Sequence, residues 1–232
     1  MGYKIENPRL YQVLEQFKSI QGEGINIGRW VTFIRLRGCN LNCPWCDTKE
    51  SWIEVSPAAS SCRWMSAEQI VAEIETKEIV ITGGEPLLYD IEYLVDCIEL
   101  SYKDPIHLYD RRIGIETNGT IEIADFSSIW NKCWITCSPK LESGYQCICA
   151  DEYKIIVDDN VDEDTLPAII ENIKNVKSST NHIRRPHNRW HPLVWLQPEG
   201  NKPENYLRVV KLVEKFQECR AGFQLHKIFN VK

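Results

Sequence analysis

The sequence lacks any long apolar run. No stretch of about 18 uncharged apolar residues occurs in its 232 residues, which excludes a helix that crosses a membrane. Residues Met1–Gln12 contain neither a basic nor an apolar segment, so no export signal is predicted and we expect the protein to stay in the cytoplasm. Basic residues are also in the minority, because 27 Lys and Arg stand against 33 Asp and Glu, for a net charge of −6. This acidity argues against direct binding to nucleic acid.

Internal repeats and low-complexity tracts are absent too, so residues 1–232 are predicted to form a single domain. With 43% apolar and 26% charged residues, the chain can bury a core, which excludes a disordered or fibrous protein. Cysteine, by contrast, is abundant at ten residues. Because disulfides seldom persist in the cytoplasm, we expect these thiols to be metal ligands, reactive groups or buried apolar side chains.

Short apolar runs rich in β-branched residues alternate with segments of helical periodicity, which is typical of an α/β fold with a largely parallel sheet. A closed eight-unit barrel takes about 250 residues, so an incomplete (β/α) barrel or an open sheet is predicted. The predicted strands are Trp30–Arg37, Ile79–Thr82, Ile113–Glu116, Cys133–Cys137, Tyr153–Val157, Leu193–Leu196 and Phe223–Leu225, and the predicted helices are Ser66–Glu75, Tyr89–Leu100, Glu163–Val176 and Pro203–Cys219.

Polar motifs follow five of the predicted strands directly. Carboxyl ends of parallel strands meet at one edge of a sheet, and α/β proteins bind their ligands at that edge. The sequence therefore predicts a functional site there. The motifs are Arg37-Gly-Cys39, Thr82-Gly-Gly-Glu-Pro86, Glu116-Thr-Asn-Gly-Thr120, Ser138-Pro-Lys140 and Gln197-Pro-Glu-Gly200.

Three thiols occur within eight residues, in Cys39-Asn-Leu-Asn-Cys43-Pro-Trp-Cys46. Such a loop can surround one inorganic centre. A structural zinc site is one interpretation, but it needs a fourth ligand, from Cys62 or beyond. Three thiolates on a four-iron cluster leave one iron open, as a site that binds a substrate or cofactor requires.

The CxxxCxxC pattern after a strand resembles that of the radical S-adenosylmethionine (SAM) superfamily. The second motif, Thr82-Gly-Gly-Glu-Pro86, is similar to the segment with which that superfamily binds the amino group of SAM. The resemblance implies an incomplete (β/α) barrel with about six parallel strands and a 4Fe-4S cluster on Cys39, Cys43 and Cys46. It also implies that an electron from the cluster splits SAM and yields a 5′-deoxyadenosyl radical.

Eight short blocks resemble the 7-carboxy-7-deazaguanine synthase family within this superfamily. The family converts 6-carboxy-5,6,7,8-tetrahydropterin to 7-carboxy-7-deazaguanine with loss of ammonia, on the path to queuosine-type nucleosides. The blocks are Phe17-Lys-Ser-Ile-Gln-Gly-Glu-Gly24, Phe33-Ile-Arg-Leu-Arg-Gly-Cys39, Cys46-Asp-Thr48, Val80-Ile-Thr-Gly-Gly-Glu-Pro86, Ile115-Glu-Thr-Asn-Gly-Thr120, Ser138-Pro-Lys140, Leu196-Gln-Pro198 and Gln224-Leu-His-Lys227.

The resemblance implies a set of substrate contacts. Arg35 has a planar fork suited to the substrate carboxylate, and Gln21 can pair with the ring edge of a pterin. The alternatives are a salt bridge at a strand end for Arg35 and a solvated loop position for Gln21. The substrate residues are Ile20, Gln21, Gly22, Glu23, Arg35 and Thr82, and Glu23 and Glu116 are acid or base candidates by residue type alone.

The resemblance also implies contacts with SAM and with Mg²⁺. Thr48 is expected to bind Mg²⁺, a hard cation that keeps several waters, and the alternative is a turn formed with Asp47. Trp45 is expected near the adenine, or else in core packing. The residues expected at SAM are Trp45, Cys46, Asp47, Gly84, Ser138, Pro139, Lys140, Gln197, Pro198, Glu199 and Gly200.

The family resemblance further implies a homodimer and an electron donor such as flavodoxin. A glycyl-radical activating enzyme shares the triad and the Gly-Gly motif, and a zinc-binding interaction module is the alternative from another class. The cysteines outside the triad are most simply buried thiols. The basic segment Asn181–His191 is interpreted as an exposed insertion, and the alternatives are a patch that binds anions or nucleic acid and a histidine metal site. The remaining cysteines are Cys62, Cys97, Cys133, Cys137, Cys147, Cys149 and Cys219.

Overall fold

The computed structural model describes residues 10–52, 62–102, 112–124, 127–140, 149–176 and 193–232. The chain divides into two compact units. The N-terminal unit comprises Met1–Ser19, Arg29–Thr117 and Ile123–Trp134, and the C-terminal unit comprises Ile20–Gly28, Asn118–Glu122 and Ile135–Lys232. That all 232 residues form one domain stays a prediction. None of the helices in the described ranges has the length and apolar character needed to cross a bilayer.

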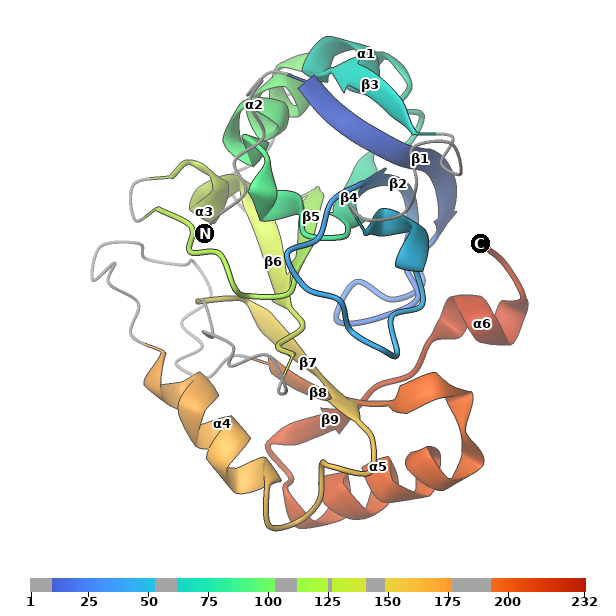
Figure 1. The fold of residues 1–232 in the computed structure, drawn as a ribbon, viewed down its shortest axis with the longest axis vertical. Coiled ribbons are helices and arrows are strands. Elements are labelled where there is room, and N and C mark those ends of the chain that lie inside the picture. Colours follow the sequence, from blue (N-terminus) through green and yellow to red (C-terminus); the bar gives the residue numbers. More distant parts are fainter. Residues whose placement is uncertain (1–9, 53–61, 103–111, 125–126, 141–148, 177–192) are drawn as a thin grey trace. The chain divides into compact units, whose positions relative to one another are not determined.

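In the N-terminal unit the strand order is β3-β1-β2-β4-β5. Strands β2, β4 and β5 are parallel, whereas β1 pairs with β3 in the antiparallel sense. Figure 1 shows α1 beside β3 at the β3 edge of this sheet. The strands are β1 (Leu10–Ile20), β2 (Trp30–Leu36), β3 (Arg63–Ser66), β4 (Glu78–Gly83) and β5 (Ile113–Thr117), and the helices are η1 (Lys49–Ser51), α1 (Ala67–Ala72), η3 (Pro86–Leu88), α2 (Ile91–Ser101) and α3 (Ile129–Lys132).

In the C-terminal unit the strands follow one another as β6-β7-β8-β9 and are all parallel. Helix α5 packs on β8 and β9 (Figure 1). The strands are β6 (Cys133–Cys137), β7 (Glu152–Val157), β8 (Leu193–Pro198) and β9 (Cys219–Ala221), and the helices are α4 (Leu166–Asn175), η5 (Glu199–Asn201), α5 (Pro203–Lys215) and α6 (Leu225–Phe229).

The predicted α/β class with a largely parallel, unclosed sheet is confirmed. Within the described residues β3 pairs only with β1 and β9 only with β8, so neither unit closes into a barrel. In β4 the four central positions are buried and in β7 all but one are, as expected for parallel strands covered on both faces. The predicted helix start at Ser66 is confirmed as well. Its hydroxyl accepts from the Gln69 N–H at 3.4 Å, and the Gln69 side chain accepts from the Ser66 N–H at 2.9 Å.

Three expectations differ from the structure. The predicted strand Phe223–Leu225 is wrong, because β9 lies at Cys219–Ala221 and Leu225 begins α6. The predicted helix Pro203–Cys219 is too long, since α5 ends at Lys215 and Cys219 pairs in the sheet. Strands β1 and β3 were not expected. Strand β1 contains several charged and amide residues, and apolar burial alternates clearly only in its first half, at Tyr11 and Val13.

Candidate active site

The cysteine loop, residues 37–48, connects β2 to η1 in the N-terminal unit. It is fastened at its start, where the Gly38 N–H donates to the Ser51 carbonyl at 2.7 Å. The Cys46 N–H donates to the Cys43 carbonyl at 3.0 Å, which closes a turn, and the Leu41 N–H donates to Cys39 Sγ at 3.4 Å. All three cysteines are half-buried free thiols. The loop therefore presents three thiols within a short, folded segment.

The Gly-Gly motif packs against this loop because β4 is the parallel neighbour of β2. The Gly84 N–H donates to the Leu36 carbonyl at 3.0 Å, and the Glu85 N–H donates to the Gly38 carbonyl at 2.7 Å. A Cβ atom on Gly84 would lie 2.1 Å from the Gly38 oxygen and 2.9 Å from Cys39 Cβ. No side chain fits there, so the close approach of motif and loop depends on this glycine.

Glu85 within the same motif is fully buried. Its carboxylate accepts the Leu87 N–H at 3.0 Å and the Thr117 hydroxyl at 2.7 Å. These bonds hold the turn after β4 in place, so the carboxylate serves the fold of the motif.

Electrostatics in the cysteine loop favour a cationic centre. Burial raises the pKa of Cys39, the Leu41 N–H lowers it, and the neighbouring Glu85, Cys43 and Cys46 raise it further. Within the described residues, no three His, Cys, Asp or Glu side chains are grouped closely enough to hold one metal ion. A 4Fe-4S cluster has a different requirement, because each thiolate binds its own iron and the ligands need not converge on one point. The donor set therefore fits a cluster held by three thiolates with one iron open.

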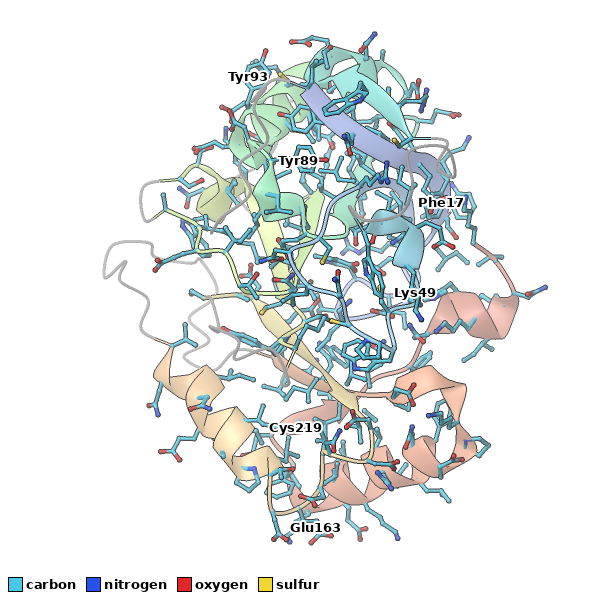
Figure 2. The ribbon with its side chains drawn as sticks, in the orientation of Figure 1. Phe17, Lys49, Tyr89, Tyr93, Glu163 and Cys219 are labelled. Carbon is cyan, nitrogen blue, oxygen red and sulfur yellow. The ribbon has the colours of Figure 1, made fainter. Side chains whose placement is uncertain are left out.

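Arg35 and Thr48 lie together beside the cysteine loop. Arg35 Nε donates to Glu15 Oε1 at 2.9 Å and Nη1 donates to the Thr48 hydroxyl at 3.4 Å. The guanidinium carbon also lies 6.0 Å from the ring centroid of Phe17, which Figure 2 labels. Thr48 in turn donates to Asp47 Oδ1 at 3.2 Å. Both alternative contacts, the Arg35–Glu15 salt bridge and the Asp47–Thr48 hydrogen bond, are therefore present. The Asp47 carboxylate and the Thr48 hydroxyl are also oxygen groups of the kind that Mg²⁺ prefers.

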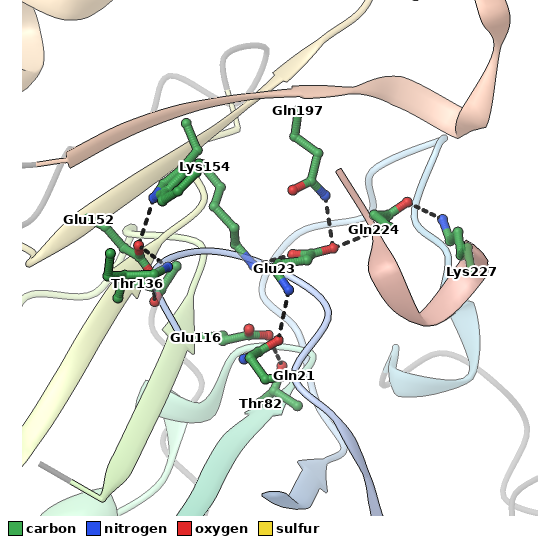
Figure 3. A network of polar contacts seen from close by, with 12 residues as sticks. Gln21, Glu23, Thr82, Glu116, Thr136, Glu152, Lys154, Gln197, Gln224 and Lys227 are labelled. Atoms are coloured by element: carbon green, nitrogen blue, oxygen red, sulfur yellow. Dashed lines mark hydrogen bonds and ion pairs between the residues drawn. The ribbon is translucent and has the colours of Figure 1, made fainter. Parts of the chain in front are cut away.

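Two further predicted residues of the N-terminal unit meet each other. Thr82, at the end of β4, is 7% exposed and donates its hydroxyl to Glu116 Oε2 on β5 at 3.0 Å (Figure 3). Glu116 is therefore tied to a predicted substrate residue, a contact that the sequence did not predict.

Trp45, which is predicted to lie near the adenine of SAM, is half-buried within the cysteine loop.

In the C-terminal unit, the predicted SAM residues lie after β6 and at the end of β8. Ser138, Pro139 and Lys140 follow β6 directly, and Pro139 is buried. Gln197 and Pro198 end β8, and Gly200 lies in η5. Glu199 is already engaged by other groups, since its carboxylate pairs with Lys202 Nζ at 2.6 Å.

The loop of residues 20–28 carries the predicted substrate residues Ile20, Gln21, Gly22 and Glu23. Gln21 is buried, and its side-chain oxygen accepts the Glu23 N–H at 3.2 Å. The Leu225 N–H donates to the Gly22 carbonyl at 3.0 Å, which ties the loop to the start of α6. This loop is therefore ordered by contacts from distant parts of the sequence.

Glu23 accepts from three side chains (Figure 3). Lys154 Nζ lies 2.5 Å from Oε2, while Gln197 Nε2 and Gln224 Nε2 donate to Oε1 at 2.8 and 2.7 Å. Burial by itself raises the pKa of Glu23, but the Lys154 charge and these hydrogen bonds outweigh it and lower the pKa to about 2. The carboxylate is ionised at neutral pH and suited to accepting hydrogen bonds rather than donating a proton.

Sequence reasoning missed several residues of this network. Lys154 is 5% exposed in the middle of β7, and Glu152 on the same strand is 2% exposed. Charged residues are rarely that deeply buried unless they are paired, so two charges inside a predicted apolar strand were the available signal. Gln224 and Lys227 lie in the block Gln224-Leu-His-Lys227, which favours a small polar ligand but does not predict their contacts with Glu23 and with each other.

The expectation of buried thiols outside the triad holds for three of the six cysteines that the structure describes there. Cys133, Cys137 and Cys219 are buried, and burial raises the pKa of Cys219 to about 11. Cys62, Cys97 and Cys149 are half-buried free thiols. The predictions for Cys147 and for the Asn181–His191 segment lie outside the described residues.

The fold, the three-thiol loop and the glycine-lined turn beside it together define a class of protein. Residues 33–133 match the family model of the radical SAM superfamily, whose members use a 4Fe-4S cluster and SAM. This match spans both the cysteine loop and the Gly-Gly motif.

Three known proteins are similar over nearly the whole chain. A 7-carboxy-7-deazaguanine synthase of Prochlorococcus marinus is 33% identical over 94% of this chain and 97% of its own, and one of Aquifex aeolicus is 32% identical over 94% and 93%. The crystal structure of QueE from Escherichia coli superposes with a TM-score of 0.69 at 27% identity, covering 94% of this chain and 95% of that one. The chain belongs to the 7-carboxy-7-deazaguanine synthase family.

Proposed function

We propose that this protein converts 6-carboxy-5,6,7,8-tetrahydropterin to 7-carboxy-7-deazaguanine with loss of ammonia, on the path to queuosine-type nucleosides. The observation that carries this proposal is the 33% identity to a 7-carboxy-7-deazaguanine synthase over 94% of the chain. The loop geometry supports it, because three half-buried thiols lie against a turn that admits only glycine.

Cys39, Cys43 and Cys46 hold the 4Fe-4S cluster in this proposal. When bound, the cluster and SAM supply the 5′-deoxyadenosyl radical that starts the reaction. Gly84 keeps the turn after β4 against the cysteine loop that would hold the cluster. Trp45 and Asp47, on either side of Cys46, contact the adenosine part of SAM.

Arg35 binds the carboxylate of the pterin through its guanidinium fork. Since Arg35 is paired with Glu15 in the protein alone, the substrate carboxylate takes over part of that pairing. Thr48, whose hydroxyl lies 3.4 Å from Arg35 Nη1, would help to hold Mg²⁺, which would bring positive charge to the substrate carboxylate. Thr82 contacts the substrate and keeps its bond to Glu116.

Further ligand contacts are assigned to residues of the C-terminal unit. Gln21 and Glu23, with the backbone of Ile20 and Gly22, pair with the guanine-like edge of the pterin. The remaining residues bind the ribose and methionine parts of SAM. They are Ser138, Pro139, Lys140, Gln197, Pro198, Glu199 and Gly200.

The cellular setting is also part of the proposal. The enzyme acts in the cytoplasm as a homodimer and as one domain per chain, and a protein such as flavodoxin delivers the electron. It makes a precursor for nucleic-acid modification without contacting nucleic acid itself, in agreement with its net charge of −6.

The test is anaerobic reconstitution with iron and sulfide, followed by incubation with reductant, SAM, Mg²⁺ and the carboxypterin. The expected product is 7-carboxy-7-deazaguanine, detected by mass, together with 5′-deoxyadenosine. Cleavage of SAM without the deazapurine would point to another radical SAM reaction, such as glycyl-radical activation. A colourless protein that holds one zinc would overturn the enzyme assignment.

A further inference from the structure

The Glu23 carboxylate is surrounded by side chains that can only donate to it. Lys154 reaches Oε2 from β7, while Gln197 from β8 and Gln224 from the segment before α6 both reach Oε1. The side chains of Lys154 and Glu23 are 6% and 13% exposed, so little water competes for these bonds. Such a carboxylate is held in one orientation. A ligand that forms a hydrogen bond with it must supply the N–H or O–H group.

We propose that Lys154, with the Gln224–Lys227 pair behind it, positions Glu23 as a fixed acceptor, so that the ligand edge placed against Glu23 must present N–H groups. These residues act through Glu23 and are positioning residues. The identity of the ligand as a pterin rests on the proposed function, whereas the positioning itself does not. The amino group and ring N–H of a pterin's guanine-like edge have the required donor chemistry.

Lys227 determines which way the Gln224 amide faces. Lys227 Nζ donates to Gln224 Oε1, and an ammonium group has no acceptor to offer. The amide nitrogen of Gln224 must therefore point to the other side, where it donates to Glu23 (Figure 3). With the amide reversed, two oxygens would face each other at Glu23.

The loop itself is anchored by a different carboxylate. Glu152 accepts the Ile25 N–H at 3.0 Å, the Trp195 ring N–H at 2.7 Å and the Thr136 hydroxyl at 2.8 Å. A Cβ atom on Gly24 would lie 2.4 Å from Glu152 Oε1, so loop and anchor are in close contact. Because this anchor does not involve Lys154, a substitution of Lys154 acts on the Glu23 carboxylate rather than on the fold of the loop.

The first experiment replaces Lys154 with Met in the reconstituted enzyme and measures KM and kcat for the carboxypterin from pH 5.5 to 8.5. We expect kcat/KM to fall about 100-fold, mostly through KM, because a buried carboxylate loses its cation. The affinity should fall further as the pH decreases, since only the Gln197 and Gln224 hydrogen bonds then oppose the effect of burial, the pKa of Glu23 rises, and the protonated oxygen no longer accepts. Lys154→Arg should recover about tenfold of the loss through its retained charge.

Two controls make the readout specific. Lys174→Met removes an exposed lysine of the same unit, paired with Glu218 at 3.5 Å, and should behave as wild type. The other titratable groups near the loop are Glu152, Lys227 and His226, so the pH effect is assigned by comparison with Glu23→Gln. The double variant Lys154→Met/Glu23→Gln should lack the added pH dependence.

The second experiment follows the Glu23 carboxyl by ¹³C NMR in the SAM-free holoenzyme, with the signal assigned from Glu23→Gln. Lys154→Met should raise the titration midpoint, because the largest contribution that lowers it is lost, whereas Lys174→Met should not change it. If Lys154→Met does not fold, exposed Lys227→Met takes its place, with an expected tenfold rise in KM.

A folded Lys154→Met with the wild-type KM and pH profile would overturn the positioning role. So would an unchanged Glu23 midpoint. If the wild type makes no deazapurine, the proposed function fails, and the NMR titration alone decides on the positioning role.

Discussion

The cysteine loop and the loop of residues 20–28 carry half of the predicted ligand residues and differ in how they are ordered. The cysteine loop presents three half-buried thiols with backbone bonds at its ends, and burial raises the pKa of Cys39. The loop of residues 20–28 presents Glu23, which is largely shielded from water at 13% side-chain exposure, ionised and bonded to three side chains. The negative charge of three thiolates in the cysteine loop has to be compensated by an added inorganic group. The negative charge of Glu23 is compensated by hydrogen-bond donors of the protein itself.

This difference shows two ways in which one chain prepares a site. Thiolates that bind separate irons gain their final geometry from the cluster, so the protein needs only a suitable loop and a close neighbour. An acceptor for an organic ligand must be in place before binding, because reorganising a buried charge is costly. Substitutions in the first region should therefore abolish cofactor loading, while those in the second should change affinity and stability by degrees.

The largest effect is expected for Cys43→Ala. Two thiolates cannot replace the three that hold the cluster, so iron content and SAM cleavage should both be lost. Iron and sulfide analysis after reconstitution measures the first, and 5′-deoxyadenosine formation the second. Cys97→Ala, at a half-buried free thiol of the same unit, is the matched control and should load normally. Full cluster loading by Cys43→Ala would show that the cluster does not depend on all three cysteines of this loop.

Gly84→Ala should have the next largest effect. Its added Cβ would meet the Gly38 oxygen at 2.1 Å and Cys39 Cβ at 2.9 Å, so turn and cysteine loop must separate. A displacement of this kind costs about 100-fold in activity. Gly114→Ala on β5 is the control, because its nearest neighbour would be 3.6 Å away. Equal activities of the two variants would show that close packing at Gly84 is dispensable.

Glu152→Gln tests the anchor of the second loop. The amide keeps one acceptor oxygen for the Ile25 and Trp195 N–H groups, so its NH2 must face the Thr136 hydroxyl, which then has to turn from donor to acceptor. The free energy of unfolding, measured with urea, should fall by about 1–3 kcal/mol. Glu75→Gln breaks the exposed pair with Lys18 and should cost less than about 0.5 kcal/mol. A neutral Glu152→Gln would mean that the loop is held in some other way.

The smallest effect concerns the pH dependence of stability. The pKa of Glu23 is lowered from 4.5 to about 2 in the folded protein, so its contribution to stability is present above pH 4.5 and is lost as the pH falls toward 2. Between pH 4.5 and 3.5 this loss amounts to about 1 kcal/mol. Urea unfolding across this range should show a shallower slope for Glu23→Gln than for the wild type. Identical slopes would show that Glu23 is not held as an ionised group.

Much of the fold followed from local patterns. Six of the seven predicted strands are confirmed because β-branched runs in buried parallel strands give a strong signal. Strand β1 was missed because polar and charged residues interrupt its pattern, and β9 was misplaced because Phe223 is more apolar than Arg220. Pairing with β8 decided that position, and single-residue propensity carries no information on pairing partners.

The sequence by itself determined the chemistry of the metal site. The spacing of Cys39, Cys43 and Cys46 and the nearby Gly-Gly turn are local features, and a cluster needs little beyond thiols at the right separation. Only the tertiary structure decided how Glu23 is used. Its partners Lys154, Gln197 and Gln224 lie 131 to 201 residues away along the chain, and their donors meet one carboxylate because β7, β8 and the segment before α6 fold together. The charge state of a buried group depends on what surrounds it in space, which sequence spacing does not specify.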